Sequence, residues 1–538
     1  MTIKGVTMST PERLSDALTQ WRNLLGAAHL LCDPSSLERY ARCTEPTGAA
    51  PAAVLLPESV EALVSAVKIA AACSVPLYPV SRGKNWGYGS TSPAQEGSVL
   101  VDLSRMNRIL EVNAKLGYAV VEPGVSQRDL YDHLVKNRIP LSMDVTGAPS
   151  DSSLLGNILE RGYGQTPYSD HFLHSCGMEV VLADGTIVRT GFGHYAQAKT
   201  AHLHKWGVGP YLDGLFTQSN FGIVTKIGIW LMPEPADFGV FSFKMSDDEP
   251  FAMALERVRE LKMRDVLTSA VHFFNDVRVL SSLRQFPWKE SAGTTPLSDE
   301  LAERLRRDWR VGTWNCGGGL RGSTAQIRVT LAEVRKALKG LARVEFISQR
   351  KVGLLSRLRP AVKSRNMDLL SRKLPFFGLM RGIPTDDPTL IAYWRKRTAA
   401  PQTPYDPPRD KCGLIWCAPV IPLLKEDALE TVRLTRSVCR QHGFEANISM
   451  NLITARSISC VIGILYDKED GRETRKAAAC YEELLKRFCA LGYLPYRVAH
   501  PFPKELLQPE DPFWNVCRSI KKALDPKGII SPGRYGLR

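Results

Sequence analysis

The segment Pro79–Ser90 combines three glycines, two basic residues and short polar residues directly after an apolar run. Glycine lets the backbone reach positive φ and approach a ligand closely, so that successive N–H groups can face phosphate oxygens. Arg82 and Lys84 add positive charge to the same turn. This composition is typical of a diphosphate site. An ordinary glycine-rich turn has the same composition, so this segment alone leaves both interpretations open.

Other nucleotide-binding patterns are weaker. Residues Gly191–Ala196 match the loose form of the dinucleotide fingerprint, but the region after them is polar and histidine-rich rather than an apolar helix, which predicts a turn. The sequence has no Walker A loop and no HExxH helix. The turn at 79–90 is therefore the best phosphate site that the chain offers.

The length of 538 residues predicts two domains, because one core rarely extends that far. From Pro51 to Pro233 apolar runs alternate with helical patterns, including a helix that begins near Ser59. Charged helices follow, as at Asp247–Met263 and Thr330–Lys339, with a second group of strand-like runs. A C-terminal helix is expected from Asp511, as its N-cap, to Leu524. We place the boundary at Pro233–Pro235, with domains at 1–236 and 237–499. No apolar stretch approaches the ~20 residues of a membrane-spanning helix.

Charge and cysteine content exclude several classes of function. The net charge is +15, but the basic residues are dispersed and no nucleic-acid motif accompanies them, so we interpret the charge as solubility or as steering of an anionic substrate or acidic partner. The twelve cysteines contain no CxxC pair, which indicates neither a zinc site nor a disulfide scaffold. The chain has no C-x-x-C-H motif for attaching haem, and its N-terminus lacks a signal-peptide pattern, which favours the cytoplasm.

Four further segments, together with the glycine turn, resemble the vanillyl-alcohol oxidase and p-cresol methylhydroxylase family of flavoproteins. They are Leu155–Gly164, Thr166–His171, Gly177–Gly185 and Ser531–Gly536. The resemblance implies an α+β, two-domain FAD-binding fold of this class with an α/β cap domain. It also implies that 500–538 return to complete the FAD-binding domain at 1–236, and that 237–499 form the cap.

The resemblance assigns the glycine turn to the FAD diphosphate, a second loop to the cofactor and a strand to its adenine end. The residues that it implies for FAD binding are Pro79, Ser81, Arg82, Gly83, Lys84, Asn85, Gly87, Gly156, Asn157, Gly162, Ile223 and Arg534.

Covalent attachment of the flavin is common in the resembled family, through histidine in one branch and tyrosine in the other. The histidine position falls close to Leu414, and no histidine lies nearby. Tyr405, in a proline-rich loop, occupies the place of the tyrosine branch, so we expect the link there. The alternative is that Tyr405 is an ordinary surface tyrosine.

Tyr88, Tyr496 and Arg497 look like the phenolate-binding residues of the family, with Arg534 as a further candidate. Two hydroxyl groups and a guanidinium that converge on one oxygen would lower the pKa of a phenol and hold it as phenolate. Taken singly, such residues are more often packing aromatics or surface ion-pair partners. Their positions in separate motifs favour the functional interpretation.

Acid–base residues are less well defined by the sequence. The oxidase branch places an aspartate before the Leu-Gly-Asn motif, but the loop 146–153 is one residue longer here, so Asp151 is a weak candidate for that role. Asp170 and His171 are expected to cap a turn rather than to form a catalytic dyad.

The resemblance implies an enzyme that oxidises 4-alkylphenols such as 4-cresol or 4-ethylphenol at the benzylic carbon. A p-quinone methide would form, water would add to it, and electrons would pass to a c-type cytochrome subunit. The alternative is an oxidase of the vanillyl-alcohol or eugenol type that uses O₂. A non-catalytic flavin-binding protein would not need the tyrosines and arginine. The family also suggests a homo-oligomer and, for members that use cytochromes, the periplasm.

Overall fold

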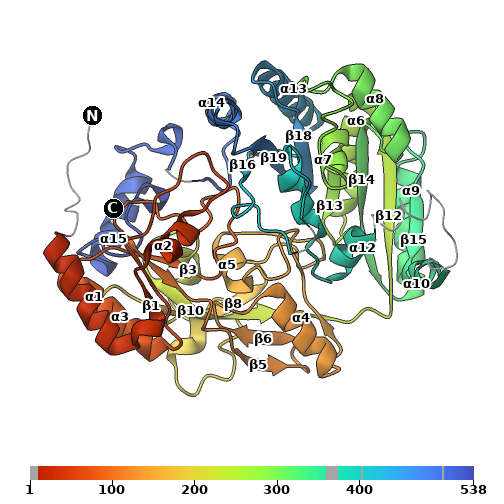
Figure 1. Cartoon of the computed structure of the whole chain (residues 1–538). Coiled ribbons are helices and arrows are strands. Elements are labelled where there is room, and N and C mark those ends of the chain that lie inside the picture. Colours follow the sequence, from red (N-terminus) through yellow and green to blue (C-terminus); the bar gives the residue numbers. More distant parts are fainter. Residues whose placement is uncertain (1–9, 359–373, 402–403, 500–501, 538) are drawn as a thin grey trace.

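The computed structural model describes residues 10–358, 374–401, 404–499 and 502–537. The chain folds into two regions that lie side by side, one built around two smaller sheets and one around a large antiparallel sheet (Figure 1). The first strand of the large sheet begins at Asp237. The predicted domain limits remain a prediction, and 1–9, 500–501 and 538 lie outside the described residues.

The first sheet has the order β1-β2-β4-β3, with β3 and β2 parallel to β4 and β1 antiparallel to β2. Its helices and strands are α1 (Pro11–Leu25), β1 (Leu30–Leu31), α2 (Pro34–Ala41), β2 (Ala53–Leu55), α3 (Val60–Cys73), β3 (Leu77–Val80) and β4 (Val99–Asp102). The predicted start of α3 is confirmed: the Ser59 hydroxyl accepts a hydrogen bond from Ala62 N at 3.2 Å. Trp21 of α1 is fully buried and donates through Nε1 to the Ala66 carbonyl at 3.0 Å, which joins α1 to α3.

The second sheet is antiparallel, in the order β5-β6-β10-β8-β9. Its strands and the helices between them are β5 (Ile109–Asn113), β6 (Tyr118–Val121), α4 (Gln127–Lys136), α5 (Leu154–Leu159), β8 (Ser175–Val181), β9 (Ile187–Arg189) and β10 (Ile223–Trp230). A separate pair is formed by β7 (Leu141–Ser142) and β11 (Met232–Pro233). Ser126 and Asp129 form a capping box at the start of α4. Gly191–His194 form a single 3₁₀ turn, as expected.

The large sheet has the order β15-β12-β14-β13-β18-β19-β16, with β17 also paired to β19. Its strands are β12 (Asp237–Met245), β13 (Val271–Asn275), β14 (Trp314–Gly322), β15 (Glu345–Ser348), β16 (Cys412–Cys417), β17 (Val420–Pro422), β18 (Asn447–Leu452) and β19 (Ser457–Asp467). The helices of this region are α6 (Asp248–Met263), α7 (Asp276–Ser281), α8 (Asp299–Trp309), α9 (Thr324–Ala337), α10 (Gln349–Leu358), α12 (Leu374–Arg381), α13 (Lys425–Gln441) and α14 (Gly471–Ala490). Helix α9 begins six residues before the Thr330 expected from the charge pattern, because Ser323 and Gln326 form a capping box there.

The two faces of the large sheet differ because side chains alternate along a strand. One face packs its apolar residues, such as Phe273, Met450 and Ile462, against α6, α9, α13 and α14. These helices lie on the outer side of the molecule in Figure 1. The alternate residues, such as His272, Asn451 and Trp416, therefore face the first region.

The C-terminal segment returns to the first sheet. Helix α15 (Pro512–Leu524) begins after the predicted cap at Asp511. Ile530 then pairs with Leu77 of β3, through backbone hydrogen bonds of 2.7 Å on each side. The buried ammonium of Lys521 donates to Asp525 at 2.5 Å and to the Ile530 carbonyl at 2.8 Å, which fixes the segment in place. Across the described residues, no helix has both the length and the apolarity needed to cross a membrane.

Candidate active site

A cavity lies between the two regions, and both supply its walls. The first region contributes the end of β3 with the turn that follows, the loop 146–153, α5, the start of β10 and the C-terminal segment. The large sheet contributes its inner face from β13, β18, β19 and β16. Trp416 N donates to the Gly87 carbonyl at 3.3 Å, so the turn and the sheet are joined directly.

The turn after β3 presents a row of free backbone donors to the cavity. None of the N–H groups of Ser81–Trp86 donates to another residue in the described part of the chain. Two hydrogen bonds hold the later part of the turn. Gly87 N donates to Thr44 Oγ1 at 2.8 Å, and Gly89 N donates to the buried Glu45 carboxylate at 2.5 Å. Adjacent N–H groups without partners form an anion-binding concavity, which fits the diphosphate of FAD.

Gly87 shows why this turn needs glycine. Its φ is +80°, and a Cβ at this position would lie 2.2 Å from Cδ1 of Trp416. Any side chain here would therefore be strained in the backbone and would displace the cavity wall.

The two basic residues of the turn already have protein partners. Arg82 donates through Nη1 to the Gly124 carbonyl at 2.9 Å. Lys84 forms an ion pair with Asp151, with Nζ 3.2 Å from Oδ2. Asp151 is not among the residues that line the cavity, whereas its neighbours Ser152 and Ser153 are. The longer loop thus places this carboxylate beside the turn.

Helix α5 approaches the same turn closely. Ser153 caps the helix by accepting from Gly156 N at 2.9 Å, and a Cβ on Gly156 would lie 3.1 Å from Ser81 Oγ. The Asn157 side chain is held by His171, whose Nδ1 lies 2.6 Å from Asn157 Oδ1. The other ring nitrogen of His171 lies 2.7 Å from Asp144.

Asp170 has a separate role in the structure. Its carboxylate accepts from Leu173 N at 2.9 Å and caps a turn, as expected. His171 does not share that role, because it bonds to Asp144 and Asn157. It therefore positions Asn157 at the cavity wall.

Three tyrosines and an arginine meet at the centre of the cavity. The rings of Tyr163 and Tyr496 are 5.8 Å apart, and the Arg497 guanidinium lies 4.3 Å from the centre of the Tyr88 ring. Burial raises the pKa of Tyr88 well above its ordinary value. It also raises the pKa of Tyr496, against the opposing effects of Arg497 and of hydrogen bonds with neighbouring groups. The hydroxyl groups therefore stay protonated at neutral pH and can donate hydrogen bonds.

Glu160, just after α5, connects two of the predicted arginines. Its carboxylate lies 2.8 Å from Arg534 Nη2 and 3.4 Å from Arg497 Nε, and it accepts from Tyr535 OH at 2.6 Å. Burial alone would raise the pKa of Glu160, but Arg534 and Arg497 outweigh it and lower the pKa to about 2. Arg497 also donates to the side-chain oxygen of Asn85 in the phosphate turn. The carboxylate thus stays ionised and orients both arginines.

The inner face of the large sheet supplies polar groups opposite the tyrosines. Asn451 donates to Tyr163 OH at 2.9 Å and accepts from His272 Nδ1 at 2.8 Å. With the proton on Nδ1, Nε2 of His272 carries a lone pair, and it is buried without a partner. Burial lowers the pKa of His272 to about 4, so the ring is neutral at physiological pH.

Tyr405 does not line the cavity. Its half-buried ring packs 5.3 Å from the Tyr393 ring, in a cluster that also holds Leu414 of the cavity wall. Burial, together with Asp387 and Asp386, raises the pKa of Tyr405.

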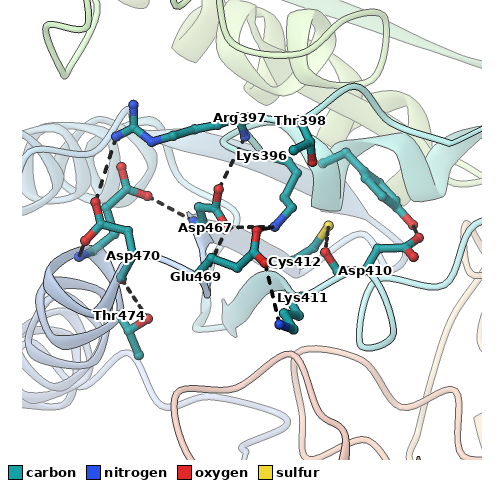
Figure 2. A network of polar contacts seen from close by, with 12 residues as sticks. Lys396, Arg397, Thr398, Asp410, Lys411, Cys412, Asp467, Glu469, Asp470 and Thr474 are labelled. Atoms are coloured by element: carbon teal, nitrogen blue, oxygen red, sulfur yellow. Dashed lines mark hydrogen bonds and ion pairs between the residues drawn. The ribbon is translucent and has the colours of Figure 1, made fainter.

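The loop that carries Tyr405 is tied to the large sheet on both sides. Figure 2 shows this polar network, in which Lys396 contacts Asp467 at 3.0 Å and Glu469 at 2.6 Å. Lys411 lies on the other side of the loop, 3.5 Å from the same Glu469 carboxylate. The network limits how far the loop can shift.

The structure brings almost all of the predicted site residues together. The cavity is lined by Pro79, Ser81, Arg82, Gly83, Lys84, Asn85, Tyr88, Gly156, Asn157, Gly162, Ile223, Tyr496, Arg497 and Arg534, but not by Gly87 or Tyr405. Gly87 instead packs closely against Trp416, which lines the cavity.

Other residues line the cavity that the sequence did not mark, among them Tyr163, Glu160, His272 and Arg278. The first two lie inside a motif that was recognised, and that motif could have indicated them. His272 and Arg278 belong to β13 and α7, where no motif marks them.

A family model for an FAD binding domain matches residues 51–191. The chain is 39% identical to 1'-carboxy-chondrochloren decarboxylase from Chondromyces crocatus over 98% of each chain. It is 31% identical to the flavoprotein subunit of 4-cresol dehydrogenase [hydroxylating] from Pseudomonas putida, over 99% of this chain and 97% of that protein. These matches confirm FAD as the cofactor, and the free donors of the phosphate turn fit it.

Two solved structures are similar along almost the whole chain. Crystalline p-cresol methylhydroxylase with substrate bound matches with a TM-score of 0.88 at 31% identity, and 4-ethylphenol oxidase from Gulosibacter chungangensis with a TM-score of 0.87 at 28% identity. Each match covers 99% of this chain and 98% of the other. The expected α+β, two-domain FAD-binding fold is confirmed.

Proposed function

The chain belongs to the vanillyl-alcohol oxidase and p-cresol methylhydroxylase family of FAD-dependent oxidoreductases, and on that premise we propose that it oxidises the benzylic carbon of a para-substituted phenol. The observation that carries the proposal is the convergence of Tyr88, Tyr496 and Arg497 in a cavity that also contains the free donors of the phosphate turn.

The tyrosines and Arg497 bind the substrate as phenolate. Tyr88 and Tyr496 remain protonated and donate to the phenolate oxygen, while Arg497 supplies a fixed positive charge beside them. Charge-assisted hydrogen bonds in a site shielded from water lower the pKa of the bound phenol. The Glu160 carboxylate lies 3.4 Å from Arg497 Nε and so sets the orientation of the guanidinium. The phenolate pushes electron density toward the para carbon, where oxidation takes place.

FAD, when bound, would supply the two-electron oxidant for the benzylic carbon of the substrate. Ser81–Trp86 hold its diphosphate through their free N–H groups. Tyr405 forms a covalent link to the flavin. Its half-buried ring packs in the same cluster as Leu414, which lines the cavity.

Loss of hydride from the phenolate leaves a p-quinone methide, whose exocyclic carbon is electrophilic. Water adds to that carbon and restores the aromatic ring, giving a 4-hydroxybenzylic alcohol. His272 is neutral and its Nε2 lone pair has no partner, so it accepts a hydrogen bond from this water and positions it.

A second candidate function concerns the product. The relative from Chondromyces is named a decarboxylase of a carboxylated compound, and its similarity covers 98% of the chain. This supports a reaction in which the oxidised substrate loses CO₂ in place of adding water. The oxidation step and its phenolate-binding residues are the same in both cases.

Electrons leave the reduced flavin for a c-type cytochrome subunit. The similarity to a flavoprotein subunit and the net charge of +15, which would attract an acidic partner, support this acceptor. The similarity to 4-ethylphenol oxidase supports the alternative, in which O₂ is the acceptor.

The test is flavin reduction by single substrates without oxygen. Purified holoenzyme is mixed anaerobically with 4-methylphenol, 4-ethylphenol or eugenol while the flavin absorbance is followed, and is then reoxidised with air or with cytochrome c. We expect bleaching with at least one phenol and faster reoxidation by the cytochrome. Flavin that stays oxidised with para-substituted phenols of every kind would refute the proposed function. Rapid reoxidation by air with stoichiometric H₂O₂ would replace the cytochrome with O₂.

A further inference from the structure

Arg278 places an unpaired positive charge in the wall of the cavity. It lies in α7, one turn after Phe274, and its side chain forms no hydrogen bond or ion pair in the described part of the chain. Nε and Nη1 are buried without a partner. The guanidinium lies over the rings of Phe274 and Trp416, at 5.6 and 5.8 Å from the ring centres.

No acidic side chain is available to neutralise this charge. Glu160 is the single acidic residue that lines the cavity among the described residues, and it is already paired with Arg497 and Arg534. Burial lowers the pKa of Arg278 to about 10, which leaves it protonated at neutral pH. Contacts at nearly 6 Å from aromatic rings compensate little for the loss of water around a buried cation.

The arginine also lies near the substrate-binding end of the cavity. Burial raises the pKa of Tyr163, whose ring is adjacent to Tyr496, and the Arg278 charge partly opposes that rise. Burial lowers the pKa of His272, and the Arg278 charge adds to that effect. A ligand that occupies the tyrosine cluster with its phenol oxygen would therefore extend toward this guanidinium. The planar fork of an arginine matches a carboxylate in size and donor spacing.

We propose that Arg278 binds a carboxylate on the side chain of the phenol, so that the substrates are 4-hydroxyphenyl compounds with an anionic group on the carbon next to the benzylic carbon, and that oxidation is followed by loss of CO₂. The inference rests on the proposed function and names the substrate class for the same site.

The chemistry balances with the flavin as the only oxidant. The phenolate ⁻O–C₆H₄–CH₂–CHR–CO₂⁻ gives a hydride from its benzylic carbon to FAD and becomes the quinone methide O=C₆H₄=CH–CHR–CO₂⁻. The bond to the carboxyl carbon then breaks, and its electron pair forms the new double bond as the ring regains aromaticity. The products are ⁻O–C₆H₄–CH=CHR and CO₂, and a cytochrome or O₂ reoxidises the flavin. A carboxylate on any other carbon could not deliver its electrons to the exocyclic carbon.

The test compares an acid with its neutral amide. Wild-type holoenzyme is reduced anaerobically by 3-(4-hydroxyphenyl)propanoate, by the corresponding primary amide and by 4-ethylphenol, over a range of concentrations, and the products are identified. We expect the acid to half-saturate the reduction rate at about tenfold lower concentration than the amide, because it gains a charge-assisted contact. We also expect one 4-vinylphenol and one CO₂ per flavin reduced by the acid.

Three variants test whether Arg278 causes the preference for the acid. Arg278→Gln should raise the half-saturating concentration of the acid about ten- to hundredfold and change that of the amide by less than about threefold, with FAD content unchanged. Arg278→Lys should restore part of the acid binding, since it keeps the charge and loses the fork. Arg257→Gln, an exposed arginine on α6, removes the same charge far from the cavity and should behave as wild type.

Each failure has a separate meaning. If none of the three phenols reduces the flavin, the proposed function itself is wrong. If the neutral phenols reduce it and wild-type enzyme shows no preference for the acid, or Arg278→Gln weakens acid and amide equally, the carboxylate site is refuted. An acid that is oxidised but keeps its carboxyl group in a hydroxylated product refutes the decarboxylation. Loss of FAD from Arg278→Gln, with Arg278→Lys retaining it, would assign the arginine to the cofactor instead.

Discussion

Replacing Glu160 with glutamine removes one buried carboxylate that neutralises two arginines. Arg534 and Arg497 hold the pKa of Glu160 at about 2, compared with an ordinary value of 4.5. At about 1.4 kcal/mol per pH unit, this difference corresponds to about 3 kcal/mol of stability at neutral pH. The side chain is 20% exposed, so solvent screening reduces the expected loss to about 2–3 kcal/mol.

The assay is urea unfolding of the holoenzyme at fixed FAD concentration, followed by tryptophan fluorescence, for wild type and Glu160→Gln. The matched control is Glu58→Gln, which removes a carboxylate that also contacts two basic side chains, His29 and Arg105, but at an exposed site. We expect a clearly smaller change in the control, because exposed pairs contribute little.

The pH dependence of the free energy of unfolding tests whether the ionised Glu160 carboxylate causes the difference in stability. Because the folded-state pKa of Glu160 is depressed, its contribution is fully present above about pH 4.5 and is lost as the pH falls toward 2. The difference between wild type and Glu160→Gln should therefore be constant from pH 8 to 6 and should narrow below about pH 4.5. Equal stabilities of the two proteins at pH 7, or a difference that grows with acidification, would refute this account of the arginine pair.

Three further predictions concern the reaction. Tyr496→Phe should slow anaerobic flavin reduction about ten- to hundredfold while FAD stays bound, because one charge-assisted donor to the phenolate is lost; unchanged reduction kinetics would show that Tyr496 is not at the phenol oxygen. Wild-type protein should remain yellow after acid precipitation and Tyr405→Phe should release its FAD, whereas retention by the variant would exclude Tyr405 as the attachment site. Cytochrome c reduction should slow as salt rises above about 0.15 M, where screening confines charge steering to about 8 Å; a rate independent of ionic strength would argue against docking by the basic surface.

Local features of the chain were predictable because neighbouring residues decide them. The helix start at Ser59 follows from a side chain that accepts a nearby backbone N–H group. The turn after β3 is set by its glycines, and Gly87 adopts φ +80° as that composition suggests. The predicted start of α9 at Thr330 is wrong. The charge pattern begins at that residue, whereas the capping box that starts the helix lies earlier, at Ser323.

The candidate site was predictable where family motifs carry it and not elsewhere. Tyr88, Tyr496 and Arg497 were all recognised from motifs, and all line the cavity. Arg534 was also recognised, but its partner Glu160 was not, because the contact joins residues 374 positions apart in the chain.

By itself the sequence determined the local elements and the glycine turn, because these depend on residues within a few positions of each other. The class of cofactor followed from family motifs spread between residues 79 and 536. Only the tertiary structure decided which residues of the large sheet face the cavity. Side chains alternate between the two faces of a strand, so the register and packing of the large sheet turn His272, Phe274 and Trp416 toward the cavity and Phe273 away from it. Arg278 is one arginine among many in the sequence. It becomes distinctive only because the fold buries it at the cavity wall, where no ion pair forms with it in the part of the chain that the structure describes.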